Sequence, residues 1–134
     1  YLPPGEEPTE EYPFVLVTGR ILEHYCSGAQ TRRTHIMELV NHDALEVHPD
    51  DARRLAVRSG QSVRVISGRS EIVMTVEVSE RVAPGQLFAS FHFPENNLNM
   101  LLSSSADEAS RCPEYKVSTV RLESLKRPSV GKSR

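Results

Sequence analysis

Short strand-like segments recur along this chain at close intervals, and they restrict its fold more than any other feature of the sequence. Each segment is either apolar throughout or alternates apolar with polar residues, the pattern of a strand with a buried face. The segments are Phe14–Thr18, Ala44–His48, Ser62–Ser67, Glu71–Val78, Leu87–Phe93 and Tyr115–Leu122. Five or six strands at this spacing predict a small closed β-barrel, because closure leaves few exposed strand edges.

The connections between these segments carry turn and helix signals. Gly68-Arg69-Ser70 predicts a β-hairpin turn, and Pro84-Gly85 predicts a type II turn. Pro49-Asp50-Asp51 predicts the start of a helix, because carboxylates are favoured in the first turn, and Ser59-Gly60 is the expected end. The run Ile36–Val40 fits either a strand or a helical turn. The expected fold is therefore mainly β with one or two short helices.

The composition is that of a globular chain with balanced charge. Its 134 residues fit one domain. Apolar residues make up 38%, charged residues 25%, and the net charge of −2 excludes a general attraction to nucleic acid or an anionic membrane. No apolar run reaches the roughly 20 residues of a membrane span. Cys26 and Cys112 are too few for a disulfide framework, so free thiols in a reducing, cytoplasmic compartment are expected.

The two ends of the chain differ in composition from its middle. Residues 1–12 are rich in proline and glutamate and are expected to form a flexible linker from something upstream. Residues 126–134 are expected to form a flexible basic tail. The barrel domain is therefore expected to span residues 13–125, and the start at Tyr1 is typical of a processed chain or an excised domain.

The segment Thr18–Arg33 follows the first predicted strand and concentrates the residue types of an anion site. It contains two glycines, several hydroxyl residues, a histidine and three arginines. Glycine lets backbone N–H groups approach a phosphate, and hydroxyl and guanidinium groups satisfy its oxygens. The alternative is a solvated loop whose arginines pair with nearby carboxylates.

Two further polar segments adjoin predicted strands. Pro94–Arg111 is a long connection rich in asparagine and serine, and Pro113–Lys116 leads into the last strand. On a closed barrel these two segments and the arginine-rich loop can converge on one rim. Amide side chains there suit a heterocycle, and Lys116 suits a phosphate. The structural alternatives are a capping role for Asn99 and a half-buried strand position for Tyr115.

Catalytic patterns are weak by comparison. The five histidines form no helical pair at metal-ligand spacing, and no Gly-x-Ser-x-Gly nucleophile elbow occurs. Cys26 stands near His24 in the sequence, but two residues do not make a catalytic triad. The sequence therefore favours a binding domain with no catalytic or metal-ligating residue of its own.

Four stretches together resemble the C-terminal molybdopterin-dinucleotide-binding domain of molybdenum or tungsten oxidoreductases, and most of all that of formate dehydrogenase catalytic subunits. They are Val17–Arg33, Val47–Leu55, Phe91–Asn99 and Pro113–Val117, in the family's order. The resemblance implies a double-psi β-barrel that closes over one side of a bis(molybdopterin guanine dinucleotide) cofactor with molybdenum or tungsten. The expected function is to bind and bury this cofactor in a formate dehydrogenase, with no activity of the domain alone.

The resemblance also supplies the expected cofactor-binding residues. The Thr-Gly-Arg loop, its histidine and its hydroxyls would contact the pterin and the pyrophosphate, and the asparagine and Tyr-Lys positions would contact the pterin. On this chain the set is Thr18, Gly19, Arg20, His24, Ser27, Thr31, Arg33, His92, Asn99, Tyr115 and Lys116, with Asn97 as a competitor of Asn99.

The catalytic parts of such enzymes are expected outside this chain. The metal ligand, a catalytic histidine and at least one iron–sulfur cluster of the family lie in upstream domains, and neither cysteine here stands in a matching motif. The expected partners are those upstream domains of the same polypeptide or complex, with no nucleic acid and no direct membrane contact. Two alternatives stay open: a separate cofactor-binding subunit of a related oxidoreductase, and a non-catalytic barrel that binds peptide or protein partners.

Overall fold

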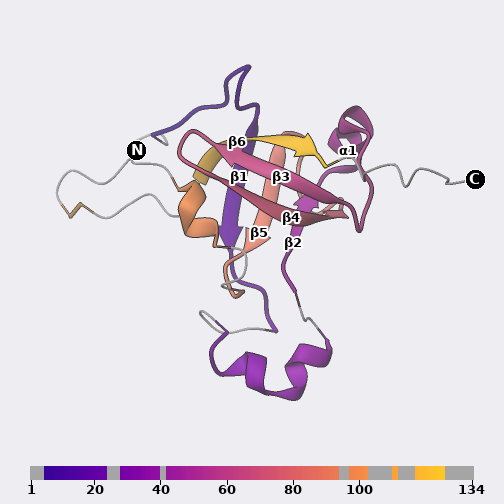
Figure 1. The fold of residues 1–134 in the computed structure, drawn as a ribbon, viewed down its shortest axis with the longest axis vertical. Coiled ribbons are helices and arrows are strands. Elements are labelled where there is room, and N and C mark those ends of the chain that lie inside the picture. Colours follow the sequence, from indigo (N-terminus) through magenta and orange to yellow (C-terminus); the bar gives the residue numbers. More distant parts are fainter. Residues whose placement is uncertain are drawn as a thin grey trace, which may run out of the picture.

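Six strands close into one barrel in the computed structural model, in the order β1-β5-β2-β4-β3-β6 (Figure 1). The structure describes residues 5–23, 28–39, 42–93, 97–102, 110–111 and 117–125. The strands are β1 (Phe14–Gly19), β2 (Ala44–Val47), β3 (Ser62–Ser67), β4 (Glu71–Val78), β5 (Gln86–Ser90) and β6 (Val117–Ser124). The predicted closed β-barrel is confirmed.

The barrel combines parallel and antiparallel pairs. β1 runs parallel to β5 and β2 runs parallel to β4, whereas the other neighbours are antiparallel. The β3–β4 pair is the hairpin that the sequence predicts. The type II turn is also present, because the Gln86 N–H donates to the Ala83 carbonyl at 3.0 Å and Gly85 has a φ of +80°. This mixed topology agrees with the double-psi barrel that the family resemblance implies.

Alternate residues of each strand point into the barrel and form its core. The alternation follows from strand geometry, in which successive side chains face opposite sides. The inward residues of the strands are Phe14, Leu16, Leu45, Val47, Val63, Val65, Met74, Val76, Leu87, Ala89, Val120 and Leu122. Leu98 and Leu101, from the short 3₁₀ helix η3 (Leu98–Leu101), complete the core together with Ala52 and Val57. In β3 and β4 the alternation in the sequence is therefore sufficient to indicate the buried face.

The α-helix α1 (Pro49–Leu55) is shorter than the sequence predicts. It starts as expected at Pro49, after His48, whose Nδ1 accepts the Asp50 N–H at 3.1 Å. It ends before Ala56, which has a left-handed φ of 54°, rather than at Ser59-Gly60. This early turn directs Val57 into the core, where it is 6% exposed.

No helix among the described residues is long and apolar enough to cross a membrane.

Several segments differ from the predicted strand pattern: β1 ends one residue later and β2 one residue earlier than predicted. β5 ends at Ser90 rather than at Phe93, because its neighbour β1 offers no partner beyond Gly19. The ambiguous run Ile36–Val40 overlaps a 3₁₀ helix, η2 (His35–Glu38), which follows η1 (Thr31–Arg33). The two helices η1 and η2 lie outside the barrel wall (Figure 1). β6 extends to Ser124, two residues beyond the predicted Leu122.

Two glutamates of the segment before β1 contact the outer face of β6. The Glu6 carboxylate accepts the backbone N–H and the hydroxyl of Thr119, both at 3.0 Å. Glu11 lies 3.4 Å from the Arg121 guanidinium. Both glutamates belong to residues 1–12, the expected linker. The boundary between this linker and the barrel domain stays a prediction.

Replacing Asp51 with alanine is expected to lower the free energy of unfolding by about 2 kcal/mol, because a buried carboxylate that accepts hydrogen bonds is lost. Asp51 joins α1 to the turn before β5: Oδ2 accepts the Gly85 N–H at 2.6 Å and Oδ1 accepts from Arg54 at 2.9 Å. Urea unfolding measures the change. Asp50→Ala is the matched control, because Asp50 is exposed and pairs with Arg53 only at the surface. Equal losses in both variants would contradict the prediction.

Candidate functional site

One end of the barrel collects the ends of β1 and β5 and the start of β6. β1 and β5 run parallel with Gly19 opposite Ser90, so both strands leave the barrel at this end. β6 runs antiparallel to β1 with Val117 opposite Val17, so it begins there. We call this end, defined by Gly19, Ser90 and Val117, the loop rim. The three polar segments that the sequence singles out therefore connect to neighbouring strands at one rim: two follow β1 and β5, and the third leads into β6.

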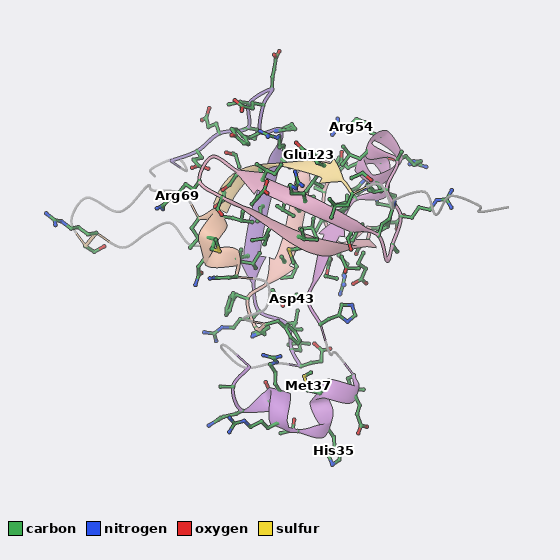
Figure 2. The ribbon with its side chains drawn as sticks, viewed as in Figure 1. His35, Met37, Asp43, Arg54, Arg69 and Glu123 are labelled. Carbon is green, nitrogen blue, oxygen red and sulfur yellow. The ribbon has the colours of Figure 1, made fainter. Side chains whose placement is uncertain are left out.

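A buried polar pair joins β2 to β5 at the loop rim. Asp43, just before β2, is 4% exposed, and its carboxylate accepts the hydroxyl of Ser90, which is 3% exposed. Figure 2 shows Asp43 between the barrel and the segment that carries Met37 and His35. Sequence reasoning missed this pair, because a lone aspartate before a strand carries no distinguishing signal. The pair fixes the point from which the connection after β5 leaves the barrel.

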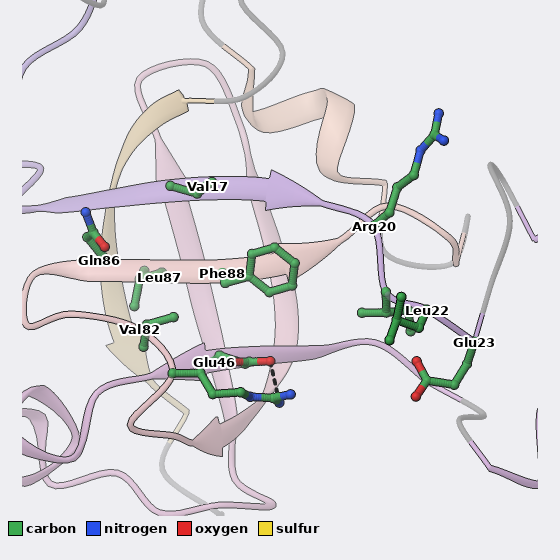
Figure 3. Close-up of a pocket in the computed structure, with 11 residues that line it drawn as sticks. Val17, Arg20, Leu22, Glu23, Glu46, Val82, Gln86, Leu87 and Phe88 are labelled. Atoms are coloured by element: carbon green, nitrogen blue, oxygen red, sulfur yellow. Dashed lines mark hydrogen bonds and ion pairs between the residues drawn. The ribbon is translucent and has the colours of Figure 1, made fainter.

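The predicted residues Thr18, Gly19 and Arg20 lie together at the end of β1. Thr18 and Gly19 are its last two residues, and Arg20 follows directly. A Cβ atom at Gly19 would lie 2.7 Å from a ring carbon of Phe88, so glycine allows that aromatic ring to lie against the strand end. Figure 3 shows the Arg20 guanidinium directed away from the Glu46–Arg81 ion pair. This cation at a rigid strand end suits an anionic group.

His92 is placed differently from the other predicted contacts. Its side chain is fully buried, at 0% exposure, and its Nε2 accepts the Ile21 N–H at 3.0 Å. Thr31 and Arg33 lie on η1, outside the barrel wall, and Arg33 is exposed. The structure therefore brings His92 against the start of the arginine-rich loop, while Thr31 and Arg33 belong to the part of the loop that extends away from the strands.

Both candidate asparagines are exposed beside the core-forming residues of η3. Asn97 stands at the N-cap position of η3, and its side chain makes no capping hydrogen bond. Asn99 lies inside η3, so the alternative of a capping role for Asn99 is wrong. The choice between Asn97 and Asn99 as the ligand contact stays a prediction. Four other predicted residues, His24, Ser27, Tyr115 and Lys116, and both cysteines lie outside the described residues.

A groove on the outer wall of the barrel adjoins Arg20. Two cavities of about 470 and 340 Å³ share the lining residues Ile21, Glu23, Glu46, Arg81 and Phe88. Figure 3 shows the cavity of about 470 Å³. Glu46 is only 8% exposed, and its carboxylate accepts from Arg81 at 2.6 Å. Sequence reasoning missed the groove, because its lining comes from four strands and from connections that are far apart in the chain.

The side chains of the loop rim suit an anionic ligand with a heterocycle. Guanidinium groups give charge-assisted hydrogen bonds to phosphate, and the amides of Asn97 and Asn99 offer both donors and acceptors. Among the described residues, no group of three or more His, Cys, Asp or Glu could hold a metal ion. These donors fit the phosphate and heterocyclic parts of a dinucleotide cofactor. Fold and rim together define the chain as a small β-barrel of the ligand-binding class.

The comparison with known families gives this class a family. The chain belongs to the molydopterin dinucleotide binding domain family, whose model matches residues 14–119. This match confirms the resemblance that the four sequence stretches indicate. The solved structure of acetylene hydratase from Pelobacter acetylenicus has the same fold, with a TM-score of 0.73 and 18% sequence identity over 92% of this chain and 21% of that chain.

Curated relatives are much longer than this chain. It is 41% identical over 122 residues to the F420-dependent formate dehydrogenase subunit alpha of Methanocaldococcus jannaschii, covering 90% of this chain and 18% of that protein. It is 36% identical over 126 residues to the F420-dependent formate dehydrogenase 1 subunit alpha of Methanococcus maripaludis, covering 93% of this chain and 19% of that protein. A nitrate reductase of Symbiobacterium thermophilum is 40% identical over 125 residues, covering 90% and 17%. The chain thus spans less than a fifth of each of these relatives.

Proposed function

We propose that this chain is the cofactor-binding domain of a molybdenum- or tungsten-dependent formate dehydrogenase and holds part of a bis(molybdopterin guanine dinucleotide). The observation that carries the proposal is the family match over residues 14–119, joined to identities of 36–41% with formate dehydrogenase alpha subunits. The greater length of those relatives supports a catalytic body in the same polypeptide or complex. An iron–sulfur cluster in that body is part of the proposal and rests on the family resemblance.

The role of this chain is to bind and orient the cofactor. The Thr18–Arg33 loop, in which Arg20 is the first residue after β1, would hold the pyrophosphate through charge-assisted hydrogen bonds. Asn99 or Asn97, together with the Tyr115-Lys116 pair, would hold the pterin. When bound, the cofactor supplies the metal that takes up the two electrons released as formate becomes carbon dioxide and a proton. The barrel excludes water on its side of the cofactor and keeps the dinucleotide in a fixed orientation.

Replacing Arg20 with alanine in the longer protein that carries this domain is expected to weaken cofactor binding about tenfold to a hundredfold. A hydrogen bond to a charged group is worth about 1.5–3 kcal/mol, and every 1.4 kcal/mol is tenfold in affinity. Metal analysis of the purified protein, produced with limiting molybdate or tungstate, measures the occupancy and identifies the metal.

Arg64→Ala is the control for the Arg20 variant. Arg64 lies on β3, across the barrel from β5, and approaches Glu71 at 3.7 Å and Glu123 at 3.5 Å. Its loss removes the same charge without touching the loop rim, so metal content is expected to stay at the wild-type level. Normal metal content in both variants, with normal activity, would count against the proposed function.

A different reaction for the whole enzyme is the second candidate, because the nitrate reductase relative is 40% identical over 125 residues. The domain's role would be the same, and the substrate would be set by the catalytic body. Assays of the longer protein with formate plus an electron acceptor, and with nitrate plus an electron donor, separate the two functions. We expect formate oxidation without nitrate reduction.

A further inference from the structure

The imidazole of His92 connects two segments that are 71 residues apart in the chain. His92 follows β5 by two residues, and Ile21 follows β1 by two residues. Nε2 of His92 accepts the Ile21 N–H at 3.0 Å, and the His92 side chain is 0% exposed. Because a buried histidine lies between the ends of two parallel strands, the backbone next to Arg20 is held from the neighbouring strand.

The far side of the arginine-rich loop meets the same short segment. A Cβ atom at Gly28 would lie 2.7 Å from the carbonyl oxygen of His92, so the two backbones are in close contact. The guanidinium carbon of Arg32 lies 5.2 Å from the centre of the Phe93 ring, within the range of a cation–π interaction. Three independent contacts therefore join residues 92–93 to the loop, one before and two after the residues that the structure does not describe.

We propose that His92 is a positioning residue that fixes the backbone at Arg20 and Ile21, rather than a residue that contacts the ligand. Nε2 can accept the Ile21 N–H only when it carries no proton, so a neutral imidazole must carry its proton on Nδ1. With Ile21 held, the Arg20 guanidinium starts from a fixed main chain, and less conformational freedom is lost when it binds an anion. The inference rests on the proposed function, in which that anion is part of the dinucleotide.

The test compares two substitutions of nearly equal shape, His92→Gln and His92→Met. Glutamine places an acceptor oxygen close to the position of Nε2, whereas methionine fills similar space without one. Amide hydrogen exchange of Ile21, measured without ligand, is expected to accelerate about tenfold or more in His92→Met and to stay within about threefold of wild type in His92→Gln. Amides of the β3–β4 pair are the internal control and are expected to stay unchanged.

A second measurement requires no substitution. A long-range ¹H–¹⁵N NMR spectrum of the wild-type chain at neutral pH reports which ring nitrogen of His92 is protonated. A proton on Nδ1 and none on Nε2 is expected, and a proton on Nε2 would overturn the proposal. This measurement decides the question even where His92→Met fails to fold.

The possible outcomes distinguish the positioning role of His92 from the proposed function of the chain. Equal acceleration of the Ile21 amide in both variants, or no acceleration in either, overturns the positioning role. A further measurement compares the metal content of the longer protein in both variants. We expect a loss of about tenfold in His92→Met and a content close to wild type in His92→Gln. If the wild-type longer protein contains no molybdenum or tungsten while the exchange pattern holds, the proposed function fails and the positioning role stands.

Discussion

Replacing Leu45 with alanine is expected to lower the free energy of unfolding by about 2–5 kcal/mol, the range for leucine deletions in packed cores. Leu45 is 0% exposed and lies in the centre of β2, which pairs with both β4 and β5. Because a domain of this size is stable by only about 5–15 kcal/mol, one such cavity removes a large part of the total. Urea unfolding of the chain measures the loss.

The control for Leu45 is Val73→Ala on the neighbouring strand β4. Val73 lies opposite Arg64 and is 50% exposed, so its truncation opens no cavity. Its cost is expected to stay below about 1 kcal/mol, the range of β-propensity differences. Loss of the Leu45 side chain also weakens the support of the loop rim, because β2 begins directly after Asp43 and pairs with β5. If Leu45→Ala were no more destabilising than Val73→Ala, the described packing of the barrel interior would be wrong.

The strands and turns were predictable because their signals are local. Alternation over six to eight residues fixes the buried face of Ser62–Ser67 and Glu71–Val78, and Pro84-Gly85 fixes the angles of its turn. The end of α1 was not predictable in the same way, because Ala56 adopts a left-handed conformation without being glycine or asparagine. Burial of Val57 stabilises that conformation, and tertiary packing of this kind leaves no local mark in the sequence.

The candidate site was predictable in its segments and less so in its contacts. The residue types of the loop after β1 indicate an anion site, and strand register alone brings it beside the connection after β5. Which side chain faces a ligand depends on contacts between distant residues. The sequence, through its resemblance, predicts His92 as a ligand contact, whereas the structure pairs it with Ile21. Asp43 and Ser90 carry no signal until β2 and β5 are placed side by side.

Two glycines, Gly28 in the arginine-rich loop and Gly60 outside it, distinguish backbone strain from a steric clash. Gly60 and Gly28 both have left-handed φ angles, of +86° and +72°. A Cβ atom at Gly60 would meet nothing within 4 Å, so alanine there introduces backbone strain alone, about 1–2 kcal/mol. A Cβ atom at Gly28 would meet the His92 carbonyl oxygen at 2.7 Å and the Arg32 side chain at 2.8 Å. Alanine at Gly28 therefore adds a backbone clash to the same strain.

Gly28→Ala is accordingly expected to displace the loop from residues 92–93 and to reduce the metal content of the longer protein about tenfold or more, since each 1.4 kcal/mol is tenfold in affinity. Amide exchange of Arg32, whose N–H donates to the Gly28 carbonyl at 2.9 Å, should accelerate together with that of Ile21. Gly60→Ala is expected to lower stability and to leave both amides and the metal content unchanged. Because the two variants share the strain and differ in the clash, equal metal content in both would show that cofactor binding does not depend on the contact between Gly28 and His92.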